Sequence, residues 1–288
     1  MSLAVVILAA GKGTRMKSAL PKVLHAVAGK PMVQHVVDAA ASLNPANIVI
    51  VYGHGGEQVK ATVTGEQLAW AEQAEQLGTG HAVAQAMPHV KEDMVLVLYG
   101  DVPLIRPETL KDFVASVDDN TLALMTLTLN DPNGYGRIVR DGQNNVQRIV
   151  EQKDASEAEL GIQEINTGIL ACSRRFLEES LPKLSSNNAQ GEYYLTDLIA
   201  MASQSGLNVE TLQPNEGWEV DGVNDRVQLA RLERIFQQAQ AETLMRDGVT
   251  LRDPARLDIR CLLYTSDADH DRPRRDARQT RCPYTAHN

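Results

Sequence analysis

Residues 3–16 of the chain read LAVVILAAGKGTRM, and the prediction of the fold starts from this stretch. Its first eight residues are apolar and no basic residue precedes them, which is typical of a buried strand and not of an export signal. Small residues and glycines follow at 11–14, where backbone N–H groups can approach a phosphate or a base closely. The stretch therefore predicts a first strand that ends in a ligand-binding loop.

Strand-like and helix-like segments alternate beyond this loop. Further apolar runs predict strands at 48–52, 94–99 and 122–129. Helix-like stretches, two of which begin with proline, lie at 31–43, 79–87 and 107–117. This alternation predicts a doubly wound α/β fold, Rossmann-like, with a mixed and mostly parallel sheet covered by helices on both faces.

The pattern changes after about residue 130. An Asp141-Gly142 turn signal between two short apolar stretches predicts a hairpin of 137–140 with 146–150. A strand and three helices are expected after it, at 164–172, 174–184, 193–203 and 225–247, and Gly248 ends the last helix. We expect one α/β domain over residues 1–226, a helical arm or linker over 227–260, and a disordered tail, not native to the fold, over 261–288.

Composition excludes several classes of protein. The 288 residues include 43% apolar residues but no run near the ~20 that a membrane helix needs. A net charge of −9 argues against nucleic-acid binding, and the three cysteines have no metal or redox spacing, so we expect a cytoplasmic protein. The tail has no Val, Ile, Leu, Met, Phe or Trp after Leu263 and cannot bury enough apolar surface to order itself.

The basic residues of the first segment suggest a polyanionic ligand. Residues 1–37 contain no Asp or Glu but five Lys and Arg residues. The loop is neither a dinucleotide fingerprint, since Met16 stands where a small residue is needed, nor a Walker A loop. Arg15 and Lys22 follow the glycines closely, and these two cations suit different phosphates of one triphosphate.

One acidic residue stands where open α/β sheets bind their ligands. Asp101 follows the apolar run 94–99, at the carboxyl end of a predicted central strand. A hard oxygen ligand there suits Mg²⁺, although the residue can also serve as a turn cap before Pro103. No histidine cluster and no nucleophile–base arrangement stands out. This fits phosphoryl-type transfer, which needs positioning and charge neutralisation more than a protein nucleophile.

Several ordered motifs together resemble the nucleotide-diphospho-sugar pyrophosphorylases over roughly residues 1–260. The similarity is closest to the N-terminal uridyltransferase domain of bacterial enzymes that couple N-acetylglucosamine-1-phosphate uridyltransferase with glucosamine-1-phosphate acetyltransferase activity. The motifs are AAGKGTR at 9–15 with Pro21-Lys22, QAEQLGTGH at 73–81, YGDVPL at 99–104, GYGRI at 134–138, EINTG at 164–168, NNAQGEYYLTD at 187–197 and GVN at 222–224.

The resemblance implies a role for each motif. It places uracil against the loop after the first strand and the 73–79 segment, through Leu8, Ala9, Ala10, Gly11, Gln73, Gly78 and Thr79. It assigns the sugar to Gly136, Glu151 and Asn166, with Tyr194 and Thr196 as additions. It adds the Tyr99-Gly100 step to the substrate contacts and makes Asp101 and Asn224 the Mg²⁺ ligands, although Asp221 and Asp225 are equally hard ligands nearby. Arg15 and Lys22 become the catalytic cations.

The implied reaction joins UTP to N-acetylglucosamine-1-phosphate and releases pyrophosphate, for cell-wall precursor synthesis. The relatives' hexapeptide-repeat β-helix, which forms trimers and binds acetyl-CoA, has no counterpart at 261–288, so we expect a monomer without acetyltransferase activity. Alternatives are a pyrophosphorylase for another base or sugar and a non-catalytic nucleotide-sensing module. A nicotinamide-dependent dehydrogenase is disfavoured by Met16.

Overall fold

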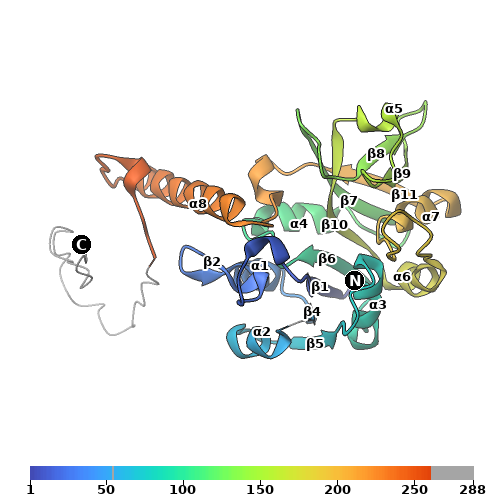
Figure 1. Cartoon of the computed structure of the whole chain (residues 1–288), viewed down its shortest axis with the longest axis horizontal. Coiled ribbons are helices and arrows are strands. Elements are labelled where there is room, and N and C mark those ends of the chain that lie inside the picture. The colour runs from blue at the N-terminus through green and yellow to red at the C-terminus, as the bar shows by residue number, and fades with distance from the viewer. Residues whose placement is uncertain (54, 261–288) are drawn as a thin grey trace.

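A computed structural model describes residues 1–53 and 55–260, and these form a sheet covered by helices on both faces (Figure 1). The main path of the sheet has the order β11-β7-β10-β6-β1-β4-β5. Its strands are β1 (Leu3–Ala9), β4 (Asn47–Tyr52), β5 (Leu68–Glu72), β6 (Met94–Tyr99), β7 (Thr121–Thr128), β10 (Glu164–Ser173) and β11 (Asn208–Leu212). Neighbouring strands are parallel except where β10 runs antiparallel between β6 and β7. The predicted mixed, mostly parallel sheet is confirmed.

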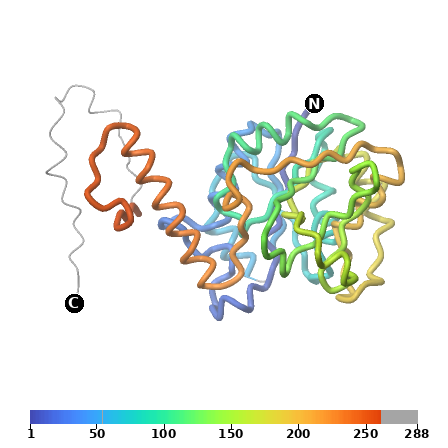
Figure 2. Tube along the Cα trace, turned by 90° about the horizontal axis from the view of Figure 1, so that it is seen from above, coloured from blue at the N-terminus to red at the C-terminus, as the bar shows by residue number. Residues whose placement is uncertain are grey.

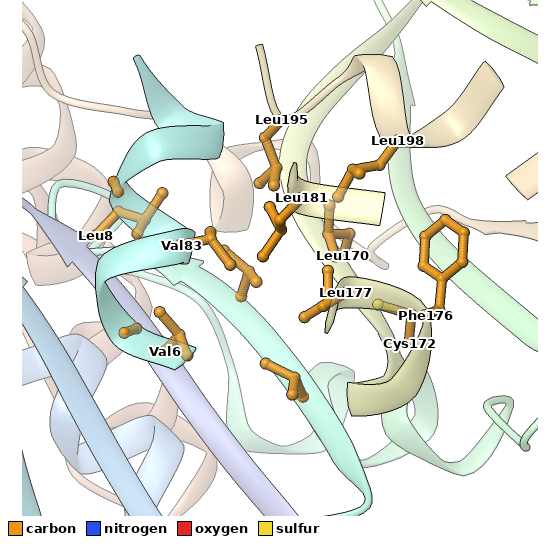
Figure 3. Close-up of a cluster of buried hydrophobic side chains, with 14 of the residues drawn as sticks. Val6, Leu8, Val83, Leu170, Cys172, Phe176, Leu177, Leu181, Leu195 and Leu198 are labelled. Carbon is orange, nitrogen blue, oxygen red and sulfur yellow. The ribbon is translucent and has the colours of Figure 1, made fainter. Parts of the chain in front are cut away.

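The alternation of side chains along β1 explains why both faces of the sheet are covered. Val5, Ile7 and Ala9 pack in the cluster that contains α1 (Met32–Ala41), α2 (Gly56–Thr62) and α4 (Pro107–Ala115). Val6 and Leu8 point to the other face, where α3 (Thr79–Ala86), α6 (Arg174–Ser180) and α7 (Asp197–Ser205) pack (Figure 3). A strand that is apolar at every position must be buried on both sides, as the sequence of β1 indicated.

The second half adds a small antiparallel extension to the sheet. The hairpin of β8 (Arg137–Arg140) and β9 (Val146–Val150) pairs with β10 through Arg137 and Ile165. The short helix α5 (Glu157–Leu160) follows, begun by a capping box at Ser156. A two-stranded ribbon of β2 (Ala26–Val27) and β3 (Lys30–Pro31) completes the strands of the described chain. The predicted hairpin around Asp141-Gly142 is confirmed.

The helix α8 (Arg226–Arg246) projects from the body of the fold (Figures 1 and 2). Asp225 caps its N-terminus, accepting the N–H groups of Val227 and Gln228 at 2.9 Å each. The following segment turns back along the helix, where the buried amide of Gln237 bonds both the N–H and the carbonyl of Ile259. The described chain therefore ends beside the middle of the arm and not at its tip.

The structure departs from the sequence predictions in its short elements and in one helix start. The short strands β2, β3, β5 and β11 and the helices α2 and α5 were not predicted. The helix expected over 193–203 begins only at Asp197, because the N–H and carbonyl of Tyr193 bond Leu77 and Gly80 across the site. The tail predicted over 261–288 lies outside the described residues. No helix among the described residues combines the length and apolarity needed to cross a membrane.

Candidate active site

A cavity of about 270 Å³ lies at the carboxyl ends of β1 and β6. These strands are neighbours in the sheet, and the N–H of Gly100 donates to the carbonyl of Leu8 at 2.9 Å, which joins the two strand ends. The cavity is lined by residues of both loops and of the 73–82 segment: Leu8, Ala9, Ala10, Gly11, Lys22, Val23, Gln73, Gln76, Gly78, Thr79, Ala82, Tyr99, Asp101 and Glu192. The expected uracil residues and the Lys22–Asp101 pair thus share one hollow.

The side chain of Lys22 lines this cavity together with Asp101. It donates to Asp101 Oδ2 in an ion pair and lies 3.4 Å from Asn224 Oδ1. Both charged side chains are largely buried, with 12% and 16% of their surfaces exposed. A backbone bond from the N–H of Val223 to the carbonyl of Asp101, 2.9 Å long, brings the 222–224 segment to the end of β6. Three residues distant in sequence therefore converge on one point.

Gly13 allows Lys22 to reach this position. Its φ is +60°, and a Cβ on it would lie 2.5 Å from the Cβ of Lys22. A side chain at residue 13 would therefore push the lysine away from the loop. The short 3-10 helix η1 (Thr14–Met16) follows directly, anchored by the buried side chain of Met16.

The donor set of this site fits a magnesium ion. Asp101 and Asn224 present a carboxylate and an amide oxygen to the same cation, the ammonium of Lys22. The described residues contain no group of three or more His, Cys, Asp or Glu that could hold a metal. Two oxygens are nevertheless sufficient for Mg²⁺, which usually takes its remaining ligands from water and substrate phosphates.

The wall of the cavity opposite β6 is built by Gln73 and the turn before α3. Gln73 is buried, and its Nε2 bonds the carbonyl of Gly78 at 3.0 Å. The hydroxyl of Thr79 accepts the N–H of Leu195 at 3.1 Å, so this turn is tied to the 193–195 segment. The side-chain amide of Gln73 and the backbone around Gly78 give this wall the donors and acceptors that the polar edge of a pyrimidine requires.

Replacing Gly78 by alanine is expected to destabilise the fold by about 2–4 kcal/mol. Its φ of +110° favours glycine, and an added Cβ would lie 2.6 Å from the carbonyl oxygen of Tyr193. Urea unfolding monitored by circular dichroism measures the change. Gly142→Ala is the matched control, expected within about 0.5 kcal/mol of wild type, because no atom lies within 4 Å of its added Cβ. Equal stability of the two variants would contradict the close packing at Gly78.

A second group of polar residues lies behind Tyr99. Glu151 accepts the hydroxyl of Thr196 at 3.1 Å, and a Cβ on Gly136 would lie 3.4 Å from Oε1 of the same carboxylate. The carbonyl of Gly136 accepts the N–H of Asn166 at 2.9 Å. The sequence thus identified three residues, Gly136, Glu151 and Asn166, that the hairpin and β10 bring together.

Tyr99 lines the cavity and also a small neighbouring hollow that Asn166 and Thr196 line. Its ring fits against Gly168, where an added Cβ would lie 2.5 Å from the ring, and the φ of +88° there also favours glycine. Burial raises the pKa of the Tyr99 phenol, and the nearby carboxylates of Glu151 and Asp101 raise it further. The phenol therefore stays neutral.

The structure does not bring Arg15 to the cavity. Its side chain is exposed on η1 and is not among the residues that line the hollow. Sequence reasoning from the residues missed Val23, Gln76, Ala82 and Glu192, which do line it. Gln76 and Glu192 belong to the motifs quoted above. The sequence of a polar loop does not show which of its side chains point into a cavity. The alternatives Asp221 and Asp225 are occupied elsewhere, by Arg231 at 3.7 Å and by the cap of α8.

The cavity lies at the carboxyl ends of strands, where open α/β sheets bind their ligands, and comparison with known proteins gives the family. The chain belongs to the MobA-like NTP transferase domain family, which matches residues 5–185. It is 95% identical over 260 residues to the bifunctional protein GlmU of Alcanivorax borkumensis, and 60% identical to that of Stutzerimonas stutzeri. Each match covers 90% of this chain, which spans 58% of the length of these relatives.

Solved structures agree on the fold. A nucleotidyl transferase from Methanothermobacter thermautotroptrophicus aligns over 83% of this chain and 99% of its own, with a TM-score of 0.61 and 18% identity. A UDP-glucose pyrophosphorylase complexed with UDP-glucose aligns over 83% of this chain and all of its own, with a TM-score of 0.67 and 15% identity. The nucleotide-diphospho-sugar transferase fold expected from the sequence is confirmed.

Proposed function

We propose that the chain transfers a uridylyl group from UTP to N-acetylglucosamine-1-phosphate and releases pyrophosphate. The observation that carries this proposal is the convergence of Lys22, Asp101 and Asn224 at one end of a cavity. Lys22, Asp101 and Asn224 can bind a cation and neutralise phosphates. Gln73 and the turn at Gly78 can contact a base, so the cavity suits a nucleoside triphosphate. Identity of 95% to a GlmU over 260 residues supports the same reaction for this part of the chain.

The chemistry is a single in-line displacement. A phosphate oxygen of the sugar phosphate attacks the α-phosphorus of UTP, a new P–O bond forms, and the bond to the bridging α,β oxygen breaks. The electron pair of that bond leaves with pyrophosphate, and no covalent intermediate with the protein is needed. What the protein supplies is the alignment of two polyanions and the neutralisation of their charge.

The chain's own residues divide these tasks. Gln73 and the turn at Gly78 hold the base, while the loop at 10–11 leaves space for the nucleotide, since an added Cβ on Gly11 meets no atom within 4 Å. When the nucleotide binds, Lys22 leaves the carboxylate of Asp101 for a phosphate oxygen. Arg15, exposed on the same loop, turns to the departing pyrophosphate.

Asp101 and Asn224 are the residues that would hold Mg²⁺. The ion would supply neutralisation of part of the charge on the substrate phosphates. The residues around it supply no base, in keeping with a phosphate nucleophile that is already ionised at neutral pH.

One assay tests the proposed activity and its specificity. Pyrophosphate release is measured for a panel of nucleoside triphosphates against sugar-1-phosphates, with and without Mg²⁺. We expect UTP with N-acetylglucosamine-1-phosphate and Mg²⁺ to give the highest kcat/KM and a nucleotide-sugar product. Preference for TTP or glucose-1-phosphate would correct the substrates but keep the chemistry. No pyrophosphate from any pair would contradict the enzyme and favour a nucleotide-sensing role.

As pH falls, sugar-phosphate binding is expected to weaken at a higher pH than the titration of an ordinary carboxylate would predict. Burial raises the pKa of Glu151, and nearby Asp154 and Asp197 raise it further, so the side chain loses its charge at a pH above its usual 4.5. As pH falls through that raised value, the carboxylate no longer accepts a hydroxyl or amide proton from the sugar. The KM for N-acetylglucosamine-1-phosphate should therefore rise as pH falls, while the KM for UTP follows a different profile.

The control is Glu151→Gln. The sugar phosphate itself titrates near pH 6, roughly as other phosphomonoesters do, and this change is common to both proteins. The difference between the two pH profiles isolates the carboxyl group. Identical profiles, with the same KM for the sugar phosphate, would remove Glu151 from the sugar site.

A further inference from the structure

Arg137 is a fully buried cation with no acid beside it. It begins β8 and is 2% exposed, and within residues 1–53 and 55–260 it makes no ion pair. Its Nε is buried and has no hydrogen-bond partner there. The next arginine along the strand, Arg140, is by contrast paired with Glu164 at 2.7 Å. Burying an unpaired charge opposes folding, so a purely structural role would be served better by an apolar residue.

The guanidinium holds the turn that precedes β8. Its Nη1 donates to the carbonyl of Tyr135, and its Nη2 lies 3.3 Å from Oε1 of Gln152. The same Gln152 oxygen accepts the N–H of Gly134, and its Nε2 donates to Asn133. Arg137 and Gln152 therefore form hydrogen bonds to three residues of the 133–136 turn, Asn133, Gly134 and Tyr135.

The hydrogen bond from Arg137 to the Tyr135 carbonyl fixes the direction of one backbone N–H group, that of Gly136. The carbonyl of Tyr135 and the N–H of Gly136 belong to the same peptide, which is trans, so the two groups point in opposite directions. Because Arg137 binds the carbonyl, the N–H of Gly136 points away from the guanidinium. Gly136 is buried, and its N–H makes no hydrogen bond within the described residues. A buried, unpaired N–H is unusual in a native protein and is satisfied when a ligand supplies the acceptor.

A matching acceptor lies beside this donor. A Cβ on Gly136 would lie 3.4 Å from Oε1 of Glu151, so the carboxylate adjoins the glycine. The carbonyl of Gly136, which belongs to the next peptide, is already used, because it accepts the N–H of Asn166. One free N–H next to one carboxylate is the arrangement that a sugar hydroxyl pair or a secondary amide can satisfy at both ends.

We propose that Arg137 is a positioning residue that, through the carbonyl of Tyr135, presents the N–H of Gly136 to the sugar of the sugar-phosphate substrate. It touches no substrate itself. The inference rests on the proposed function, since it names the residue that prepares the sugar side of that site. It also explains why a charged residue is kept in a buried position: a fork with several donors can hold a carbonyl and an amide oxygen at once.

The test compares the two substrates in Arg137→Lys, Arg137→Ala and Gln152→Ala. We expect the KM for N-acetylglucosamine-1-phosphate to rise about tenfold in Arg137→Ala and Gln152→Ala, which is the loss of roughly one hydrogen bond. Arg137→Lys keeps the positive charge but loses the planar guanidinium with its several donors. An intermediate rise in the KM for the sugar phosphate is therefore expected. The KM for UTP should stay within about twofold of wild type in all three. Gln152 is only half-buried, so Gln152→Ala is expected to fold. It tests the hydrogen bonds to the 133–136 turn if Arg137→Ala does not fold.

Arg148→Ala is the matched control. Arg148 lies on the neighbouring strand β9, is 44% exposed and pairs with Glu159, so its loss should leave both KM values unchanged. Equal rises for both substrates in the Gln152 and Arg137 variants would show a general loss of structure and overturn the inference, and so would an unchanged KM for the sugar phosphate. Failure of the proposed function is separate, because the wild-type protein would then release no pyrophosphate from any pair.

Discussion

Asp101→Ala is expected to lower turnover by about a thousandfold. The carboxylate is the stronger of two oxygens that converge on the cation position at the end of β6. Loss of the bound ion removes several kcal/mol of charge stabilisation from the transition state, and each ~1.4 kcal/mol corresponds to a factor of ten. The measurement is pyrophosphate release at saturating substrates over a range of Mg²⁺ concentrations. The variant should fail to recover at high Mg²⁺.

Lys22→Met provides a contrast that turnover alone cannot give. The Lys22 ammonium binds the same two oxygens that would hold the metal, so it competes with a divalent cation when no nucleotide is present. Its removal should tighten the binding of Mn²⁺, measured by electron paramagnetic resonance on the nucleotide-free protein, whereas Asp101→Ala should weaken it. Both variants should lose turnover. If Lys22→Met weakened Mn²⁺ binding as Asp101→Ala does, the ammonium would not occupy the metal position.

Arg15→Ala is expected to lower turnover by ~10²–10³-fold, the usual effect of removing one electrostatic donor from a transition state. Its guanidinium is exposed in the structure and lines no part of the cavity, so its contribution requires that it move when the triphosphate binds. Stability should change little, because an exposed side chain is removed. The result is therefore a loss of kcat at an unchanged unfolding midpoint.

Arg175→Ala serves as the control for Arg15. Arg175 is 87% exposed and pairs with Glu179 of the same helix, α6, and it is not among the residues that line the cavity. Near-normal turnover is expected there. Near-normal turnover in Arg15→Ala as well would remove the arginine from the site and leave Lys22 as its principal cation.

Much of the fold follows from local features of the sequence. A strand such as β1, apolar at every position, can only be central, and Pro107 and Asp225 mark helix starts that the structure confirms. The antiparallel placement of β10 was covered only by the expectation of a mixed sheet. The short strands β5 and β11 were missed, because their half-exposed residues carry no strong period.

The candidate site could also be predicted from the sequence only in part. Ligand positions at strand ends, such as Asp101, follow from the rule for open sheets. The ion pair of Asp101 with Lys22 does not, because it depends on how the loop after β1 folds back over β6. The role inferred for Arg137 is further from sequence reasoning still, since a basic residue in a polar hairpin looks solvated until its burial is known.

A crystal structure with UTP and Mg²⁺ tests the central claim most directly. The predicted result places the triphosphate at the polar end of the cavity, with Asp101 and Asn224 on the metal, Lys22 withdrawn from Asp101 to a phosphate oxygen, and Arg15 turned in to the β- and γ-phosphates. Lys22 still paired with Asp101, Arg15 facing solvent and the nucleotide bound elsewhere would contradict it.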